Sequence, residues 1–159
     1  MKKQPAYAIR IVKVSSRRIV SAQATTTLDQ LPSNVIRLLD RVWKRLRRRG
    51  VSKTGRNVVL YRDDGRSVEA GVEVSAPVPE TGSVRMSAMP AGRAATTVHW
   101  GPYPGLPRAH EAVRQWCEEH GQPLAGANWE VYGDWNDDPE KLRTDVFYLL
   151  GTAQRRSAR

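Results

Sequence analysis

The chain has 159 residues, with 26 Lys and Arg against 16 Asp and Glu, and a formal net charge of +10. Apolar residues make up 40% and charged residues 26%, which excludes a collagen-like chain and an intrinsically disordered one. This length suits one ordinary domain with a buried core. We therefore expect a single domain over residues 1–159.

The charges and the aromatic side chains are distributed unevenly. Residues 1–62 hold 16 basic and 2 acidic side chains, net +14, whereas residues 109–150 hold 3 basic and 9 acidic ones, net −6. Eight of the 11 aromatic residues lie at or after Trp100. Carboxylates interleaved with aromatic rings suit a cationic or flat organic ligand better than a phosphate chain.

Several classes of protein are excluded by what the chain lacks. One cysteine, Cys117, rules out an internal disulfide and a Cys-based zinc site. Basic residues interrupt the apolar run near the N-terminus, so we expect no signal peptide, no membrane span and a cytoplasmic location. His99, His110 and His120 lack the spacing of metal ligands, and we expect neither a metal nor a cofactor.

The elements of the first half follow from periodicity, since β-branched residues predict strands and apolar residues three or four positions apart predict a helix. The expected strands are 7–14, 18–26, 57–62 and 67–74, with a helix over 32–49. Gly50 is placed to end this helix with a left-handed cap. Asp63-Asp64-Gly65 predicts a hairpin turn, and residues 75–83 read as a linker.

The second half repeats this order. The expected strands are 84–89, 93–100, 128–134 and 144–150, with a helix from about Leu106 to His120. When the chain is slid against itself without gaps until Gly50 lies opposite Gly121, identical residues coincide at cap, turn and strand positions. We call this superposition the alignment of the two halves. Its identical pairs are Arg37 with Arg108, Val42 with Val113, Gly50 with Gly121, Gly55 with Gly126, Asn57 with Asn128, Tyr61 with Tyr132, and Asp63 with Asp134.

This repeat predicts an internal duplication and an α+β fold. We expect two pseudo-symmetric strand–helix–strand–strand modules, at approximately 7–75 and 84–150. Each should form an antiparallel sheet with its helix on one face, and a central groove between the modules would be the natural place for a ligand.

Glu130 is the position at which the repeat differs most informatively. Its counterpart in the first half is Val59, an ordinary residue for a strand interior, whereas a carboxylate there is unfavourable unless it is paired. Alternation places Glu130 and Tyr132 on one face of the strand, and Trp129 and Val131 on the other. Because Trp129 and Val131 suit the core under a helix, we expect Glu130 and Tyr132 to point away from the helix, into the groove.

Motifs across residues 7–150 resemble the GyrI-like small-molecule-binding domain family. The segments that carry the resemblance are Val59–Tyr61, Val68–Val72, Met89–Arg93, His99–Tyr103, Trp129–Tyr132 and Thr144–Tyr148. The resemblance implies two strand–helix–strand–strand modules around a central groove. Glu130 matches the groove glutamate with which multidrug-sensing regulators of this family bind flat, lipophilic cations.

The same resemblance leaves other functions open. Stand-alone members include a proposed inhibitor of DNA gyrase, and others are reported to hydrolyse cyclopropane-bearing genotoxins with the groove glutamate and an aromatic partner. No helix-turn-helix segment precedes residue 7, so we expect a stand-alone member. Small organic ligands are the expected partners, with DNA gyrase or a transcription-related protein as an alternative.

The predicted site combines Glu130 with nearby aromatic residues. The predicted ligand-binding residues are Glu130, Trp100, Tyr103, Tyr132, Tyr61 and Tyr148. If the protein is an enzyme, Glu130 would activate a water and Tyr103 would assist as the aromatic partner. Because the same residues serve binding and hydrolysis, the sequence does not choose between them.

A basic segment is the remaining candidate. Nine basic residues and Asp40 lie between Arg37 and Arg56. Such a segment is most often a solvated surface whose aliphatic stems cover apolar area. The functional interpretation is a contact for gyrase, another acidic partner or nucleic acid.

Overall fold

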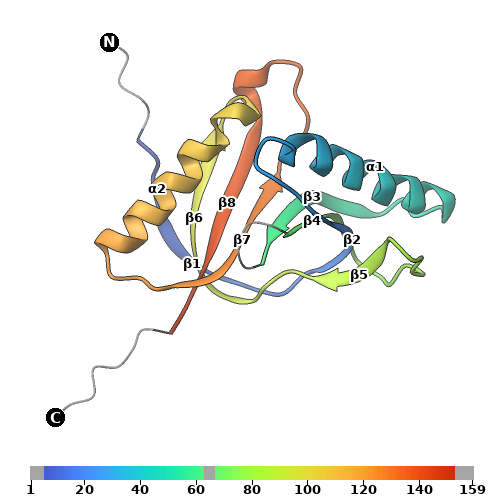
Figure 1. Cartoon of the computed structure of the whole chain (residues 1–159), viewed down its shortest axis with the longest axis horizontal. Helices are drawn as coiled ribbons and strands as arrows, with labels where there is room; N and C mark the ends of the chain where they lie inside the picture. Colours follow the sequence, from blue (N-terminus) through green and yellow to red (C-terminus); the bar gives the residue numbers. More distant parts are fainter. Residues whose placement is uncertain (1–5, 63–66, 153–159) are drawn as a thin grey trace.

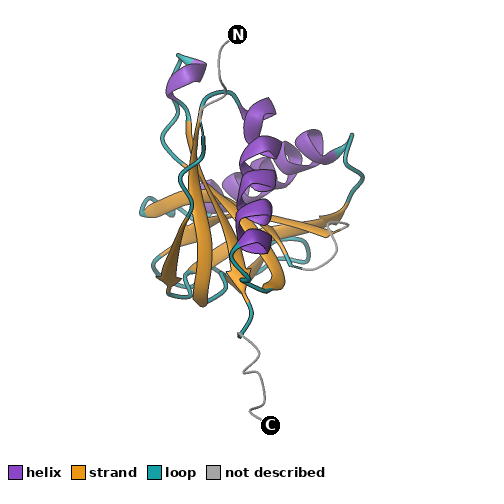
Figure 2. Ribbon diagram, turned by 90° about the vertical axis from the view of Figure 1, so that its left-hand side faces the viewer, coloured by secondary structure: helices purple, strands orange, loops and turns teal. Residues whose placement is uncertain are grey.

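The computed structural model describes residues 6–62 and 67–152, so the predicted turn at Asp63-Asp64-Gly65 lies outside the described residues. Within those residues, eight strands form one antiparallel sheet, and two α-helices cover one of its faces (Figures 1 and 2). The α+β prediction is therefore confirmed. No helix in these two ranges has the length and apolar character needed to cross a membrane.

The observed elements follow the predicted order closely. In the first half they are β1 (Arg10–Val14), β2 (Arg18–Thr25), α1 (Leu31–Arg48), β3 (Thr54–Tyr61) and β4 (Ser67–Val74). In the second half they are β5 (Arg85–Ala88), β6 (Gly92–Trp100), α2 (Leu106–Glu119), β7 (Leu124–Tyr132) and β8 (Arg143–Leu150). Short 3-10 turns span Tyr103–Gly105 and Pro139–Lys141.

Strands β3 and β7 begin earlier than predicted. Both contain an irregularity near their start, between Thr54 and Asn57 in β3 and between Leu124 and Asn128 in β7. Glycine weakens the interior of a strand. Because Gly55 and Gly126 lie near the starts of these strands, the sequence predicted that they begin only at residues 57 and 128. A bulge accommodates each glycine and lets the strand extend to the N-terminal side.

The sheet is continuous, and this corrects the expectation of one sheet for each module. The strand order is β1-β6-β8-β7-β3-β4-β2-β5. The antiparallel pairing of β3 with β7, in which Val59 lies opposite Glu130, joins the two halves. Read outward from this pair, the order is symmetric: β7, β8, β6 and β1 on one side match β3, β4, β2 and β5 on the other.

Both helices end in the same way. At the end of α1, the Val51 N–H donates to the Leu46 carbonyl (3.0 Å) and the Gly50 N–H donates to Arg47 (3.1 Å). At the end of α2, Gln122 donates to Cys117 (2.9 Å) and Gly121 to Glu118 (3.3 Å). Gly50 and Gly121 have φ values of 64° and 63°, so each cap is a Schellman motif. These four bonds coincide in the alignment of the two halves, while the duplication itself stays a prediction.

Each helix covers its own half of the sheet. Helix α1 packs on β2 and β4, and α2 packs on β6 and β8. Leu38, Val42 and Leu46 of α1 are buried in one core cluster. Leu106, Ala109, Val113 and Cys117 of α2 are buried in another. The central pair β3 and β7 therefore lies beneath the space between α1 and α2 (Figure 1).

The face of the sheet that carries no helix has its own core. Val58, Leu60 and Trp129 are buried there with Ile19, Ala94 and Met89. The connections from β1 to β2 and from β5 to β6 run between the two halves beneath this face (Figure 1). They are joined to each other, because the Met89 N–H donates to the Arg17 carbonyl at 2.8 Å.

The matched caps generate a prediction about stability. An L-residue other than glycine is strained by roughly 1–2 kcal/mol in the left-handed conformation. Gly50→Ala and Gly121→Ala should each lower the free energy of unfolding by about that amount, measured by chemical denaturation. Gly82→Ala is the control, since nothing lies within 4 Å of its added Cβ and its φ lies outside the positive range. A neutral effect at Gly50 or Gly121 would contradict the cap assignment.

Candidate functional site

Glu130 lies on the face of the sheet that carries the helices, in one of the two central strands. It is 6% exposed, in β7, with Val59 of β3 on one side and Val146 of β8 on the other. Trp129 packs on the opposite face, where its ring stacks on Phe147 with centroids 5.3 Å apart. The predicted alternation along β7 is therefore observed.

The predicted direction of Glu130 is wrong in one respect. Glu130 and Tyr132 point to the face that carries the helices, because Glu130 contacts His110 of α2 and Tyr132 packs against both helix-side clusters. The prediction assumed that the sheet has a core only under the helices. The second core on the helix-free face takes Trp129 and Val131 instead.

A chain of hydrogen bonds runs through Glu130. The Tyr132 hydroxyl donates to Glu130 Oε1 at 2.7 Å, and His110 Nε2 lies 2.8 Å from Glu130 Oε2. His110 Nδ1 lies 2.8 Å from the Tyr148 hydroxyl, to which Arg114 donates at 2.9 Å. We call these five residues, Glu130, Tyr132, His110, Tyr148 and Arg114, the Glu130 network.

The donor and acceptor of each hydrogen bond in the Glu130 network follow from the two residues whose roles are fixed, Glu130 and Arg114. An ionised carboxylate only accepts and a guanidinium only donates. His110 Nε2 therefore carries a proton and donates to Glu130. With a neutral ring, His110 Nδ1 accepts from the Tyr148 hydroxyl, whose oxygen accepts from Arg114. Each of these four bonds then joins one donor to one acceptor, and no charge on His110 is needed to complete the chain.

Among the described residues, no permanent cation contacts the Glu130 carboxylate, and this distinguishes it from the other buried carboxylates. Within residues 6–62 and 67–152, three glutamates are buried: Glu69, Glu73 and Glu130. Glu69 pairs with an arginine at 3.1 Å, and Glu73 with another at 2.9 Å. The described partners of Glu130 are a tyrosine hydroxyl and a histidine that is charged only when protonated.

Tyrosine side chains surround the carboxylate. Tyr103 packs edge to face on Tyr132, with ring centroids 5.5 Å apart. Burial raises the pKa of Tyr132 well above its usual value, and the negative charge of Glu130 raises it further. Burial, with Glu130, also raises the pKa of Tyr61. Burial raises the pKa of Tyr148, while Arg114 opposes the shift. These phenols consequently stay protonated at neutral pH and serve as hydroxyl groups.

Five of the six predicted site residues thus gather on one face: Glu130, Tyr61, Tyr103, Tyr132 and Tyr148. The sixth, Trp100, does not join them. Its side chain is 60% exposed and holds the Arg143 guanidinium 5.6 Å from its ring centroid. Ala95 packs under α2 and Ala94 on the opposite face, so alternation along β6 aims Trp100 away from the helix side. It borders a separate hollow of about 390 Å³ with Tyr7 and His99.

The sequence interpretation missed His110 and Arg114. It considered the histidines only as metal ligands, and in the described part of the chain no group of three His, Cys, Asp or Glu side chains could hold a metal ion. The signal was available in the spacing, because His110 and Arg114 are four residues apart and so lie on one stripe of α2. The alignment of the two halves places Leu39 opposite His110 and Trp43 opposite Arg114.

In the first half, four of the five positions equivalent to the Glu130 network are filled by hydrophobic residues, and the fifth, Tyr132, corresponds to Tyr61. Leu39, Trp43 and Val59 correspond to His110, Arg114 and Glu130. Val72, which pairs with Asn57, corresponds to Tyr148, which pairs with Asn128. All four first-half residues belong to, or pack against, one core cluster. The fold is therefore compatible with apolar packing at these four positions.

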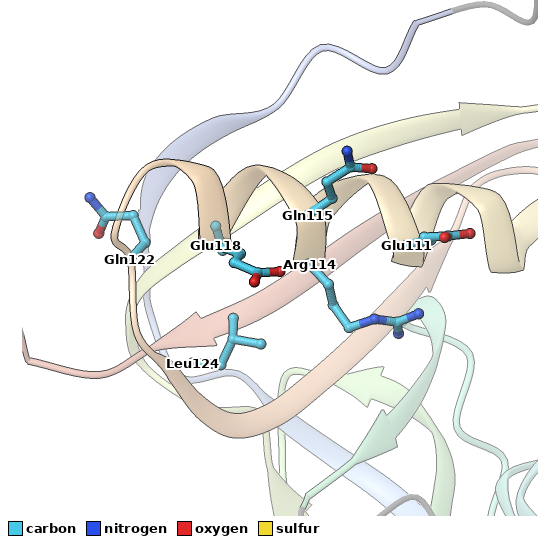
Figure 3. A pocket seen from close by; sticks show the side chains of 7 residues that line it. Glu111, Arg114, Gln115, Glu118, Gln122 and Leu124 are labelled. Atoms are coloured by element: carbon cyan, nitrogen blue, oxygen red, sulfur yellow. The ribbon is translucent and has the colours of Figure 1, made fainter.

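A hollow of about 560 Å³ adjoins the Glu130 network through Arg114 (Figure 3). It lies beside α2 and the start of β7, and its lining residues are Glu111, Arg114, Gln115, Cys117, Glu118, Gln122 and Leu124. Burial raises the pKa of the Cys117 thiol, so this cysteine is a poor nucleophile. The polar lining comes mostly from the exposed side of α2, as Figure 3 shows.

Comparison with known proteins identifies the family. The model of the GyrI-like small molecule binding domain matches residues 7–150, so the chain belongs to this family, as the sequence motifs suggested. No protein with a curated description matches the chain.

Solved structures with the same fold have low sequence identity to this chain. The C-terminal domain of EcmrR is 20% identical, with a TM-score of 0.77 over 91% of this chain and 98% of that domain. This chain spans 57% of the EcmrR chain in its complex with DNA. A hydrolase from Listeria innocua is 11% identical, with a TM-score of 0.61 over 93% of this chain and 94% of that one. SAV2435 bound to tetraphenylphosphonium is 11% identical, with a TM-score of 0.54 over 94% and 98%.

The bond between His110 and Glu130 generates a prediction about stability. His110→Leu leaves the buried Glu130 carboxylate without one of its two donors and should lower the free energy of unfolding by about 1–3 kcal/mol. Adding Glu130→Val to His110→Leu restores the pair of residues found in the first half and should recover part of that loss. A double-mutant cycle by urea denaturation measures both steps. If Glu130→Val destabilises the His110→Leu variant further, the pair does not act as described.

Proposed function

We propose that this GyrI-like domain is a cytoplasmic receptor for lipophilic, often cationic aromatic compounds, which bind between α1 and α2 against Glu130. The observation that carries the proposal is the buried Glu130 carboxylate, which has tyrosines around it and a neutral or protonatable histidine in place of an arginine. A carboxylate in such surroundings attracts a cation strongly, because little water screens its charge.

The tyrosines supply the aromatic part of this recognition. A cation over an aromatic ring gains about 0.5–2 kcal/mol for each contact. Tyr103 is 38% exposed, so it is the member of the group that a ligand meets first. The Tyr103 ring packs against the Tyr132 ring, and the Tyr132 hydroxyl donates to Glu130. These two contacts connect the exposed Tyr103 to the buried carboxylate.

The difference between the two halves supports a ligand-binding role over a structural one. A fold that can fill these four positions with Leu39, Trp43, Val59 and Val72 has no structural need for a buried network of polar groups. Such networks rarely stabilise a protein more than hydrophobic packing of similar volume. The neighbour SAV2435 was solved with a lipophilic cation, tetraphenylphosphonium, which agrees with this ligand class.

Binding of tetraphenylphosphonium to the wild type and to Glu130→Gln tests the site. We expect Glu130→Gln to weaken binding at least about 10-fold, which corresponds to about 1.4 kcal/mol. The same substitution should reduce the affinity for the neutral analogue triphenylphosphine oxide much less, because this compound makes no charge interaction with Glu130. Isothermal titration calorimetry measures both affinities.

Glu69→Gln is the matched control, since Glu69 is also a buried glutamate but lies on the helix-free face with Ser21 and Arg62. It should leave the affinity for tetraphenylphosphonium unchanged. Equal losses in Glu130→Gln and Glu69→Gln, or an unchanged affinity in Glu130→Gln, would overturn the proposed site.

The second candidate function is hydrolysis of cyclopropane-bearing genotoxic natural products at the same site. His110 favours it, because this residue links the Glu130 carboxylate to the Tyr148 hydroxyl and so provides a path for a proton. Glu130 would take a proton from a water whose oxygen bonds to a carbon of the strained ring, while a C–C bond of that ring breaks and its electron pair passes to a conjugated oxygen of the substrate. The Tyr103 hydroxyl would donate a hydrogen bond to the substrate oxygen that gains the electron pair. One structural neighbour is a hydrolase.

Incubation of the protein with cyclopropane-bearing compounds in ¹⁸O-labelled water decides between binding and hydrolysis. If the protein is a hydrolase, mass spectrometry should show a product that carries one labelled oxygen, formed by the wild type and not by Glu130→Gln. If the protein binds the same compounds but forms no labelled product with any of them, hydrolysis is rejected and only the receptor function remains.

A further inference from the structure

The outward face of α1 carries a dense group of cations that the ligand site does not use. Six basic side chains of this helix and its C-terminal cap are exposed: Arg37, Arg41, Lys44, Arg47, Arg48 and Arg49. The helix contains one acidic residue, Asp40. Leu38, Val42 and Leu46 point to the core on the opposite side of α1, so these six cations, which we call the α1 basic face, lie away from Glu130.

The α1 basic face lacks ionic partners in the part of the chain that the structure describes. Ion pairs there involve Arg17, Arg56, Arg62, Arg143 and His110. Arg37 and Arg41, like Lys44 and Arg48, are four residues apart, a spacing at which like charges destabilise a helix. The helix dipole favours cations only in the last turn, where Arg47 and Arg48 lie. It does not account for Arg37, Arg41 and Lys44.

Helix α2 shows that the fold does not require four of these six cations, whereas Arg37 corresponds to Arg108 and is shared by both helices. In the alignment of the two halves, Arg41 and Lys44 correspond to Ala112 and Gln115, and Arg47 and Arg48 to Glu118 and Glu119. Helix α2 covers its half of the sheet in the same way as α1 and ends in the same cap. Most of the α1 basic face is therefore an addition to the fold rather than a condition for it, and its concentrated charge fits a polyanion.

The composition of the α1 basic face indicates which polyanion. Five of its six cations are arginines, whose planar guanidinium groups bind phosphate in a bidentate manner. Exposed aromatic residues, which stack on the bases of single strands and anchor protein interfaces, are absent from α1 within the described residues. A helix of this length extends about 27 Å, enough to follow about eight base pairs of a duplex at about 3.4 Å each.

We propose that the α1 basic face binds the phosphate backbone of duplex nucleic acid without reading its sequence. Arg37, Arg41, Lys44 and Arg48 fall at steps of three or four residues and so form one stripe along the helix. Arg47 and Arg49 extend the charge at its C-terminal end. Because the stripe and Glu130 lie on opposite sides of α1, duplex binding and ligand binding are separate properties, and this inference does not depend on the proposed ligand.

Fluorescence anisotropy with a labelled DNA duplex of about 20 base pairs, between about 50 and 200 mM salt, tests the inference. We expect the logarithm of the binding constant to fall linearly with the logarithm of the salt concentration. Duplexes of unrelated sequence should bind with comparable affinity. Arg37→Glu/Arg41→Glu/Arg48→Glu should weaken binding at least about 10-fold and flatten the salt slope, because fewer phosphates are neutralised.

The matched control is Arg10→Glu/Arg85→Glu/Arg93→Glu, which reverses three exposed arginines of β1, β5 and β6. The control changes the net charge by the same amount as the α1 variant. Its loss of affinity for the duplex should be less than about a third of the loss in the α1 variant. The neutral variant Arg41→Gln/Arg48→Gln, which perturbs the helix little, should reproduce part of the loss. Circular dichroism checks that each variant is folded.

Three outcomes would overturn the inference: no duplex binding at about 50 mM salt, equal losses in the α1 variant and its control, or tighter binding to a single strand of the same length. A duplex of RNA serves as a second probe. Binding to either duplex supports the inference, and the stronger of the two identifies the source of the phosphates.

Discussion

The antiparallel pairing of β3 with β7 is the interaction on which the rest of the structure depends. It joins two half-sheets that each carry one helix, and it sets Val59 beside Glu130 at the centre. Because α1 and α2 pack on strands to either side, the pair β3 and β7 lies between the two parts of the sheet that the helices cover. A change in this register by one residue would move Glu130 and Tyr132 to the helix-free face, where Trp129 now packs. The position of the site is therefore a consequence of strand register.

The two halves differ in chemistry while they share a framework. The first half fills four of the five positions of the Glu130 network with Leu39, Trp43, Val59 and Val72 and places its charge on the outside of α1. The second half has polar residues at the same four inner positions, and the outer side of α2 lacks the basic stripe found on α1. One half thus serves as an internal reference for the other. The caps at Gly50 and Gly121, which both halves share, belong to folding. Features that one half lacks are candidates for function.

Much of this could be predicted from the sequence. Periodicity and glycine caps predicted the helices within a residue or two of their observed ends, and the alignment of the two halves singled out Glu130. Three differences between the prediction and the structure have physical causes. The site was placed away from the helix because a core on the helix-free face, with the β1–β2 and β5–β6 connections beneath it, was not foreseen. Trp100 was grouped with the tyrosines because it ends the strand that leads through a turn into the second helix, although alternation turns it to the other side. His110 was overlooked because its role depends on reaching Glu130 across the fold.

A crystal structure of the protein with tetraphenylphosphonium would test the central claim most directly. The account predicts that the cation lies between α1 and α2 with a phenyl ring against Tyr103. Its positive centre should lie within about 6 Å of a tyrosine ring, on the side from which Glu130 is reached, with the contact between His110 and Glu130 altered. A cation bound in the hollow beside Glu111 and Glu118, or next to Trp100, with both bonds of Glu130 intact, would contradict the account.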